Sequence, residues 1–293
     1  MALTEGTAQH VLSAACERVG LDPAGAELIR IGSNAVYRLK DPVIVRITRD
    51  GESIENAQKQ VAVARWLEAE VYPAARALHV EQPVDVAGHV TTFWESASER
   101  EDYAPINHVA AIIRKLHDLP EPPLALPTKQ PFAEFDERLS DLDNLPDEDA
   151  AFLRSRIARV RGDYKVLEFA LEPGAIHGDA NVGNVILDRE GNPLIIDLDS
   201  FCVGPREWDL VQTALFYERF GWHTEAEYRT FVEVYGFDIM EWPGYPILAD
   251  YREIAMTLWL CGKAGEDEGA AAEVHKRIES MMSGTDRRSW KPF

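Results

Sequence analysis

Two oxygen-bearing side chains flank a short predicted hairpin. Asn184 comes just before the apolar segment 185–187, and Asp197 follows the apolar segment 194–196. The stretch between the two segments is polar and contains a glycine, which is typical of a β-hairpin. A turn centred on residues 190–191 would place Asn184 opposite Asp197, with their Cβ atoms about 5 Å apart. One cation could then contact both side chains.

The chemistry of this pair indicates a phosphorylated ligand. An amide oxygen and a carboxylate suit Mg²⁺, which keeps several waters and takes its other oxygens from phosphates. Upstream, the turn-prone segment His177-Gly178-Asp179 supplies a carboxylate that could accept a proton from a hydroxyl aligned with a metal-bound phosphate. The implied reaction is phosphoryl transfer to a hydroxyl group.

These residues, together with Trp208-Asp209-Leu210, resemble the signature of the aminoglycoside phosphotransferase and choline kinase family, small-molecule relatives of the protein kinases. The resemblance implies that Asp179 is the catalytic base. It also implies that Asn184 and Asp197 bind Mg²⁺, with Asp197 in the place of the kinase DFG aspartate.

Three further polar residues accompany this set. The resemblance makes Asp209 a structural acid that supports the catalytic loop, and we interpret His177 as a residue that orients the loop. Alternation along a strand would place Asp199 on the same side as Asp197. Asp199 could therefore assist a second metal ion or lie near the acceptor, and the sequence leaves both roles open.

The resemblance implies a two-lobed, protein-kinase-like α+β fold, with a small antiparallel β N-lobe and a mainly helical C-lobe. We expect residues 1–95 to form the nucleotide-binding lobe and residues 96–104 to form a hinge or linker. Residues 105–293 would form the helical lobe that carries the catalytic loop and the acceptor site. The backbone of Glu95-Ser96-Ala97 would pair with adenine at the hinge.

The periodicity of apolar residues agrees with this order of elements. In the first lobe, strands are predicted at 27–31, 35–40, 42–48, 78–80 and 89–93, and helices at 5–18 and 55–70. In the second, helices are predicted at 108–117, 132–142, 147–169, 225–235, 248–263 and 270–282.

The phosphate-gripping residues depart from the family pattern. The turn at Gly32, Ser33 and Asn34 would cover the nucleotide phosphates with its backbone N–H groups. Arg46 stands where the family usually has a lysine, and an arginine can clamp phosphate through its fork. Gln60 stands where a partner glutamate is usual. Arg46 could therefore be positioned by Glu55, by a hydrogen bond to Gln60, or by the nucleotide itself.

Composition limits the class of partner. The formal charge of −20 argues against non-specific binding to nucleic acid or to an anionic membrane, since both require basic patches. It is compatible with a cationic acceptor. No apolar run approaches the roughly 18 residues of a membrane span, and the three cysteines form no CxxC pair. We expect a cytoplasmic protein, either a monomer or a homodimer.

The predicted function is transfer of the γ-phosphoryl group of ATP or GTP to a small hydroxyl-bearing acceptor, such as an aminoglycoside or another antibiotic, with Mg²⁺ as cofactor. Such an enzyme could confer antibiotic resistance. An amino-alcohol or sugar kinase, similar to choline or homoserine kinase, is an alternative. A protein kinase is disfavoured because Asp209 follows Asp197 by only twelve positions. The alternative of another class, motivated by Arg46 and Gln60, is a nucleotide-binding pseudokinase with a regulatory role.

Overall fold

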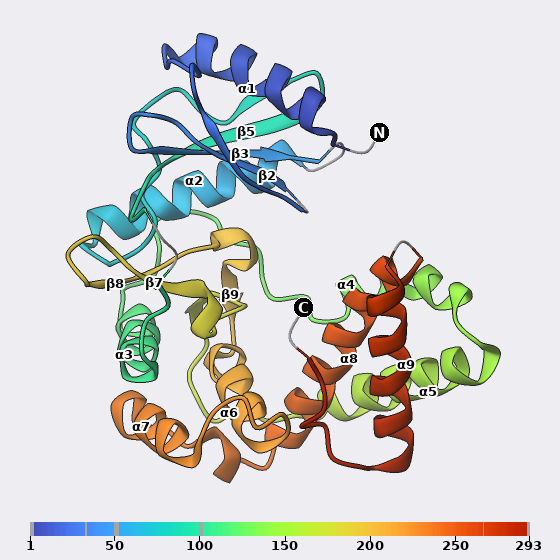
Figure 1. Ribbon diagram of the computed structural model, residues 1–293. Coiled ribbons are helices and arrows are strands. Elements are labelled where there is room, and N and C mark those ends of the chain that lie inside the picture. The colour runs from blue at the N-terminus through green and yellow to red at the C-terminus, as the bar shows by residue number, and fades with distance from the viewer. Residues whose placement is uncertain (1–2, 33, 50–52, 100–101, 266, 292–293) are drawn as a thin grey trace. The chain divides into compact units, whose positions relative to one another are not determined.

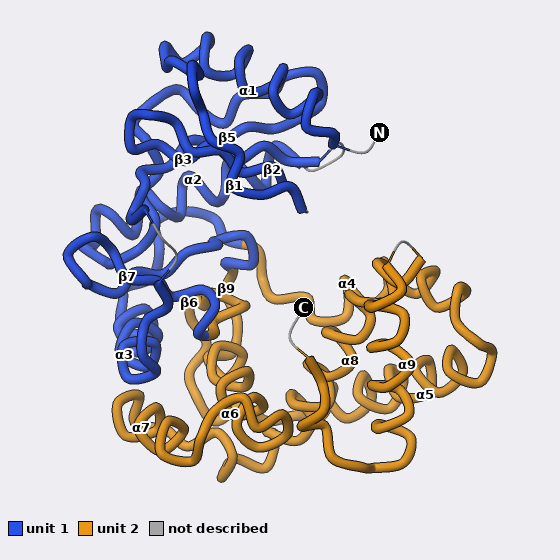
Figure 2. The backbone as a smooth tube through the Cα atoms, viewed as in Figure 1, with its two compact units in different colours: residues 1–126, 182–201 blue, residues 127–181, 202–293 orange. Residues whose placement is uncertain are grey.

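The computed structural model describes residues 3–32, 34–49, 53–99, 102–265 and 267–291 (Figure 1). The chain forms two compact units (Figure 2). Unit 1 comprises Met1–Leu126 together with Val182–Phe201, and unit 2 comprises Pro127–Asn181 together with Cys202–Phe293. The predicted hairpin therefore belongs to the same unit as the N-terminal sheet. The expected division of roles at residues 95–105 stays a prediction.

Unit 1 contains an antiparallel sheet of five strands in the order β1-β2-β3-β5-β4. The strands are β1 (Glu27–Ile31), β2 (Asn34–Arg38), β3 (Val43–Thr48), β4 (Val84–Val86) and β5 (His89–Glu95). Figure 1 shows helices α1 (Glu5–Val19) and α2 (Ile54–Ala69) on opposite faces of this sheet. The small antiparallel β region predicted from the sequence is confirmed.

Alternation along β3 decides which residues face each helix. Val43, Val45 and Ile47 are buried in one core cluster with the apolar face of α1. Because successive strand side chains point to opposite faces, Arg46 points to the α2 side. A hydrogen bond from Arg46 to Gln60 of α2 agrees with this orientation.

One strand lies later in the chain than we predicted. The sequence favoured a strand at 78–80, whereas the structure has β4 at Val84–Val86. Leu78 does reach β5, because its N–H donates to the Phe93 carbonyl at 2.9 Å, but the Gln82 side-chain amide pairs with both the N–H and the carbonyl of the same Phe93. The Gln82 side chain thus makes hydrogen bonds that the backbone of a neighbouring strand would otherwise make, and residues 78–80 form no strand.

The hairpin consists of β7 (Val185–Leu187) and β8 (Pro193–Ile195), preceded by the 3-10 turn η2 (Val182–Asn184). The N–H of Ile195 donates to the carbonyl of Pro73 at 3.0 Å, and Ile195 in turn accepts from Ala75 at 2.8 Å. Helix α3 (Ile106–His117) packs against β8 within the same unit. The hairpin is therefore joined to unit 1 by backbone hydrogen bonds.

Unit 2 is mainly helical, as predicted. Its α-helices are α4 (Ala133–Glu137), α5 (Asp147–Tyr164), α6 (Val211–Glu218), α7 (Glu225–Tyr235), α8 (Tyr245–Ala264) and α9 (Glu268–Ser283). Among its described residues, β6 (Gly174–Ile176) and β9 (Cys202–Gly204) form a two-stranded antiparallel ladder. The predicted helix at 147–169 ends earlier, at Tyr164. No helix in the described part of the chain is long and apolar enough to cross a membrane.

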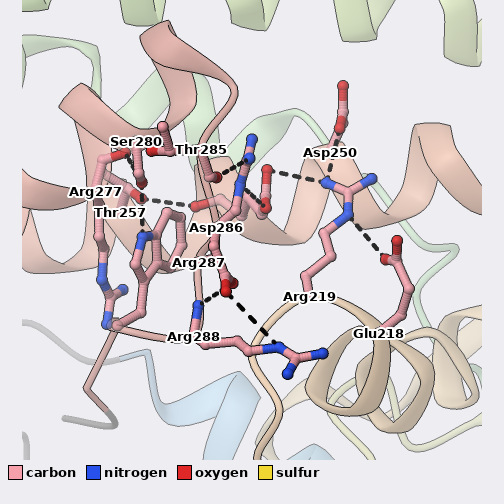
Figure 3. A network of polar contacts seen from close by, with 12 residues as sticks. Glu218, Arg219, Asp250, Thr257, Arg277, Ser280, Thr285, Asp286, Arg287 and Arg288 are labelled. Atoms are coloured by element: carbon pink, nitrogen blue, oxygen red, sulfur yellow. Dashed lines mark hydrogen bonds and ion pairs between the residues drawn. The ribbon is translucent and has the colours of Figure 1, made fainter.

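A network of buried ion pairs organises α8 and the C-terminal segment (Figure 3). The side chain of Glu253 is fully buried and contacts three arginines. Arg219 reaches it from just after α6 at 2.9 Å, Arg287 from the C-terminal segment at 2.8 Å, and Arg156 from α5 at 3.4 Å. Glu253 thus connects segments that are far apart in sequence.

Candidate nucleotide-binding and catalytic-loop sites

Arg46 contacts three acceptors within unit 1. Its Nη1 lies 2.8 Å from Oδ1 of Asp199, 3.3 Å from Oε1 of Gln60 and 3.4 Å from Oδ1 of Asp197. Its Nη2 bonds the other carboxylate oxygen of Asp199. Of the partners considered from the sequence, Gln60 contacts Arg46, whereas the Glu55 carboxylate accepts a hydrogen bond from Ser53. The bidentate pairing with Asp199 was not foreseen.

The hairpin register differs by one residue from the prediction. Val185 pairs with Ile195, so the residue opposite Asn184 is Ile196, and the Ile196 N–H donates to the Asn184 carbonyl at 2.9 Å. Asp197 follows with φ +62° and ψ +66°, in the left-handed region that non-glycine residues rarely adopt. This turn redirects the chain directly after the pairing ends, so Asn184 and Asp197 still lie at one end of the hairpin.

The donor set at this end suits Mg²⁺ chemically. It offers the amide oxygen of Asn184 and the carboxylates of Asp197 and Asp199, which are the hard oxygen ligands that Mg²⁺ prefers. No cluster of three or more His, Cys, Asp or Glu side chains able to hold a metal occurs among the described residues. A site with few protein ligands fits a cation that takes most of its oxygens from water and phosphate.

The turn predicted to cover the phosphates is described only in part, because Ser33 lies outside the described residues. Asn34 begins β2, is mostly buried, and accepts a hydrogen bond from the N–H of Gly32 at 2.9 Å. The Gly32 carbonyl accepts from Nε of Arg49 at 2.8 Å. The structure therefore adds Arg49 to the residues around this turn.

The predicted hinge leaves β5 at Glu95. The Glu95 N–H donates to the carbonyl of Arg76 at 2.9 Å, and the Ser96 N–H donates to the carbonyl of Pro42 at 2.8 Å. The carbonyl of Ala97 accepts from the N–H of Arg189 at 3.2 Å. The N–H groups of Glu95 and Ser96 are thus used within unit 1, and the pairing of this backbone with adenine stays a prediction.

The segment His177-Gly178-Asp179 lies in unit 2, directly after β6. The fully buried carboxylate of Asp209 accepts from the His177 N–H at 2.8 Å and from the Gly178 N–H at 2.7 Å. Gly178 has φ +82°, a conformation that glycine adopts without the strain other residues would bear. Asp209 and Gly178 together fix the path of the loop, and the Asp179 side chain remains 41% exposed.

Arg252 of α8 also contacts this loop and was missed by the sequence reasoning. Its Nη1 lies 3.3 Å from Oδ1 of Asp179, and its Nη2 donates to the carbonyl of Gly178 at 3.2 Å and to Gln212 at 2.8 Å. The Arg252 side chain is only 11% exposed. No motif marks an arginine so far along the chain, so only the tertiary fold could reveal it.

A second cation lies near Arg252 within unit 2. The ammonium of Lys129 lies over the ring of Trp208, 5.0 Å from its centroid, and the Arg252 guanidinium is 5.9 Å from the same ring. Burial lowers the pKa of Lys129, and the positive charge of Arg252 lowers it further. The surroundings of Asp179 are therefore more basic than the overall charge of the chain suggests.

Comparison with known proteins gives a family. The sequence profile of the Phosphotransferase enzyme family matches residues 27–251. No curated protein sequence matches the chain. The fold is similar to that of an aminopropanol kinase associated with a microcompartment, with a TM-score of 0.72, 15% identity, and coverage of 96% of this chain and 98% of that one.

Two other solved structures have the same fold. One is an amicoumacin kinase in complex with AMP-PNP, Ca²⁺ and Ami, with a TM-score of 0.70, 15% identity, and coverage of 97% and 95% of the two chains. The other is a choline/ethanolamine kinase family protein from Mesorhizobium loti, with a TM-score of 0.63, 21% identity, and coverage of 97% and 96%. At these identities the likeness establishes the two-lobed, kinase-like fold. The chain belongs to the phosphotransferase enzyme family and is a small-molecule phosphotransferase.

Proposed function

We propose that the protein transfers the γ-phosphoryl group of ATP or GTP to a hydroxyl of a small acceptor, with Asp179 as the general base. The observation that supports this proposal is the way in which the loop around Asp179 is held by hydrogen bonds. Asp209 binds the two residues before Asp179 through their N–H groups, and Arg252 binds the Asp179 carboxylate itself. A carboxylate held in this way, yet still partly exposed, can accept a proton from an acceptor hydroxyl.

The chain's own residues divide the work. Asp179 takes the hydroxyl proton as the acceptor oxygen forms its bond to the γ-phosphorus, while the bond from that phosphorus to the β,γ-bridging oxygen breaks and ADP or GDP leaves. Arg252 acts on the reaction by positioning Asp179. Arg46 binds the nucleotide phosphates, and the backbone around Ala97 binds the base. Asn184 and Asp197 would hold Mg²⁺, which when bound neutralises charge on the phosphates.

The acceptor class follows from the relatives and from charge. The relatives include kinases of amicoumacin, of aminopropanol and of choline or ethanolamine. The formal charge of −20 is compatible with an acceptor that carries an amine, although Arg252 and Lys129 make the immediate surroundings of Asp179 more basic. We therefore propose an amine-bearing alcohol, either an aminoglycoside or other antibiotic, or an amino alcohol. An antibiotic acceptor would make the protein a resistance enzyme.

The test is turnover of ATP and GTP with Mg²⁺ against a panel of aminoglycosides, other antibiotics, amino alcohols and sugars, scored by the mass gain of the acceptor. Asp179→Asn is expected to reduce transfer by about 100-fold or more while nucleotide binding persists. Asp163→Asn, which removes the same charge from an exposed position on α5, is the matched control and should leave turnover unchanged.

Two outcomes would contradict the proposal. Full activity of Asp179→Asn would remove the assigned base. Nucleotide binding without transfer to any acceptor, and without slow hydrolysis that depends on Asp179, would instead favour the regulatory pseudokinase.

A further inference from the structure

The partner of Arg46 can be identified from the geometry of one ion pair in unit 1. Arg46 and Asp199 meet with both guanidinium Nη atoms on both carboxylate oxygens, one of the two contacts measuring 2.8 Å. Such a fork-to-fork pairing is the strongest arrangement available to these two groups, because two parallel charge-assisted hydrogen bonds form together. The contacts of Arg46 with Gln60 and Asp197 are single and longer, at 3.3 and 3.4 Å.

Asp199 sits on a turn that is itself held in place. It lies in the 3-10 turn η3 (Leu198–Ser200), whose Leu198 is buried. The ammonium of Lys59, on α2, donates to the backbone carbonyl of Asp199. The buried ring of Phe201, just after the turn, packs edge-on against Trp66 of α2, with centroids 6.1 Å apart. Helix α2 thus fixes the carboxylate that binds Arg46, although its own residue 60 is a neutral glutamine.

The three residue types are mutually consistent. Arg46 already faces the carboxylates of Asp197 and Asp199, so a glutamate at position 60 would place a third carboxylate beside this guanidinium. Gln60 accepts a hydrogen bond without adding that charge. A lysine in place of Arg46 would present a point charge, which cannot engage both oxygens of Asp199 in parallel.

We propose that Asp199 is the positioning residue for Arg46, and that it supplies from the η3 turn the negative charge that the family resemblance places on α2. This inference rests on the proposed function, in which Arg46 binds the nucleotide phosphates. It assigns Asp197, and not Asp199, to the metal ion. Arg46 in place of the usual lysine and Gln60 in place of the usual glutamate then belong to one altered phosphate-binding arrangement, and they do not indicate lost activity.

The experiment measures the dissociation constant of Mg-ATP by calorimetry, without acceptor, for the full chain and its variants. Asp199→Asn is expected to weaken binding by about tenfold or more, because Arg46 loses the charge-assisted pair of hydrogen bonds that orients it. Adding Gln60→Glu to that variant gives Arg46 a carboxylate partner on α2 in place of Asp199. The affinity for Mg-ATP should then return to within about threefold of that of the natural chain, because Arg46 is again held by a charged partner.

Controls separate this role from others. Asp85→Asn removes the same charge from an exposed position on β4 and should leave the Mg-ATP affinity unchanged. Thermal unfolding of every variant reports whether it folds. Should Asp199→Asn not fold, Arg46→Lys is the second probe. It is expected to bind Mg-ATP more weakly than the natural chain and to be improved by Gln60→Glu.

Several results would contradict the role assigned to Asp199. An unchanged affinity in Asp199→Asn or in Arg46→Lys would contradict the proposal. So would a folded Asp199→Asn, Gln60→Glu double variant that stays weak but recovers when Mg²⁺ is raised, since Asp199 would then be a metal ligand. Failure of the natural chain to bind any nucleotide would instead overturn the proposed function.

Discussion

At the scale of single residues, the loop that carries Asp179 is held by contacts that the motif does not contain. Asp209 belongs to the recognisable signature and binds the loop backbone through two N–H groups. Arg252 does not belong to it, yet its side chain reaches the Asp179 carboxylate, at 3.3 Å. The loop geometry therefore depends on α8 as well as on the signature.

Replacement of Arg252 should separate chemistry from nucleotide binding. We expect Arg252→Ala to lower kcat by about tenfold, because a hydrogen bond between charged groups contributes roughly 1.5–3 kcal/mol, while the KM for ATP changes little. Arg252→Lys should recover part of the loss. Steady-state kinetics measure both constants, and Arg229→Ala, in an exposed ion pair of α7, is the control. A rise in KM with unchanged kcat would contradict the positioning role.

At the scale of elements, the sequence predicted what is periodic and missed what depends on side-chain pairing. Helices 108–117 and 225–235 were placed within two residues, since each has one apolar face. The strand at 78–80 was wrong because Gln82 pairs with the Phe93 backbone. The pairing of Asp199 with Arg46 could not be predicted either, because it requires a turn and a strand that only the fold brings together.

The packing of α8 should depend strongly on Glu253. Replacing one member of a buried, paired set leaves charges without compensation, which typically costs about 3–5 kcal/mol. We therefore expect Glu253→Gln to lower the free energy of unfolding by about 3 kcal/mol, because Arg287 loses the carboxylate that it contacts and Arg156 and Arg219 are left sharing that of Asp250. Glu225→Gln, in an exposed pair on α7, should change it by no more than about 0.5 kcal/mol. Equal small effects, measured by urea unfolding, would contradict the structural role of the network.

At the scale of the whole molecule, two buried thiols report on the two units separately. Burial and the nearby Asp22 raise the pKa of Cys16, in unit 1, to about 11. Burial and the nearby Asp141 raise the pKa of Cys261, in unit 2, to about 12. Both thiols are therefore neutral and shielded in the folded chain at ordinary pH, which makes them unreactive toward alkylating reagents.

Alkylation at pH 8 should thus modify Cys16 and Cys261 only as their units unfold, with peptide mass spectrometry after a urea series as the measurement. The unfolded thiols ionise near pH 8.5, so the stability contributed by both groups is complete below that pH. It is lost as the pH rises toward 11 to 12, because the unfolded chain releases these protons first. Rapid alkylation of either thiol in the folded protein at pH 8 would contradict their burial.

The division of unit 1 into two chain segments has a consequence for synthesis. When residue 126 leaves the ribosome, the hairpin that completes the unit has not been made, and about 75 further residues must follow, which takes roughly 4 to 15 s. During this interval the nascent sheet carries Arg46 but lacks Asp197 and Asp199. In these partial chains α1 and α2 have already been made and can cover the two faces of the sheet, while the Pro73 carbonyl and the Ala75 N–H still lack Ile195 and Arg46 still lacks the Asp199 carboxylate.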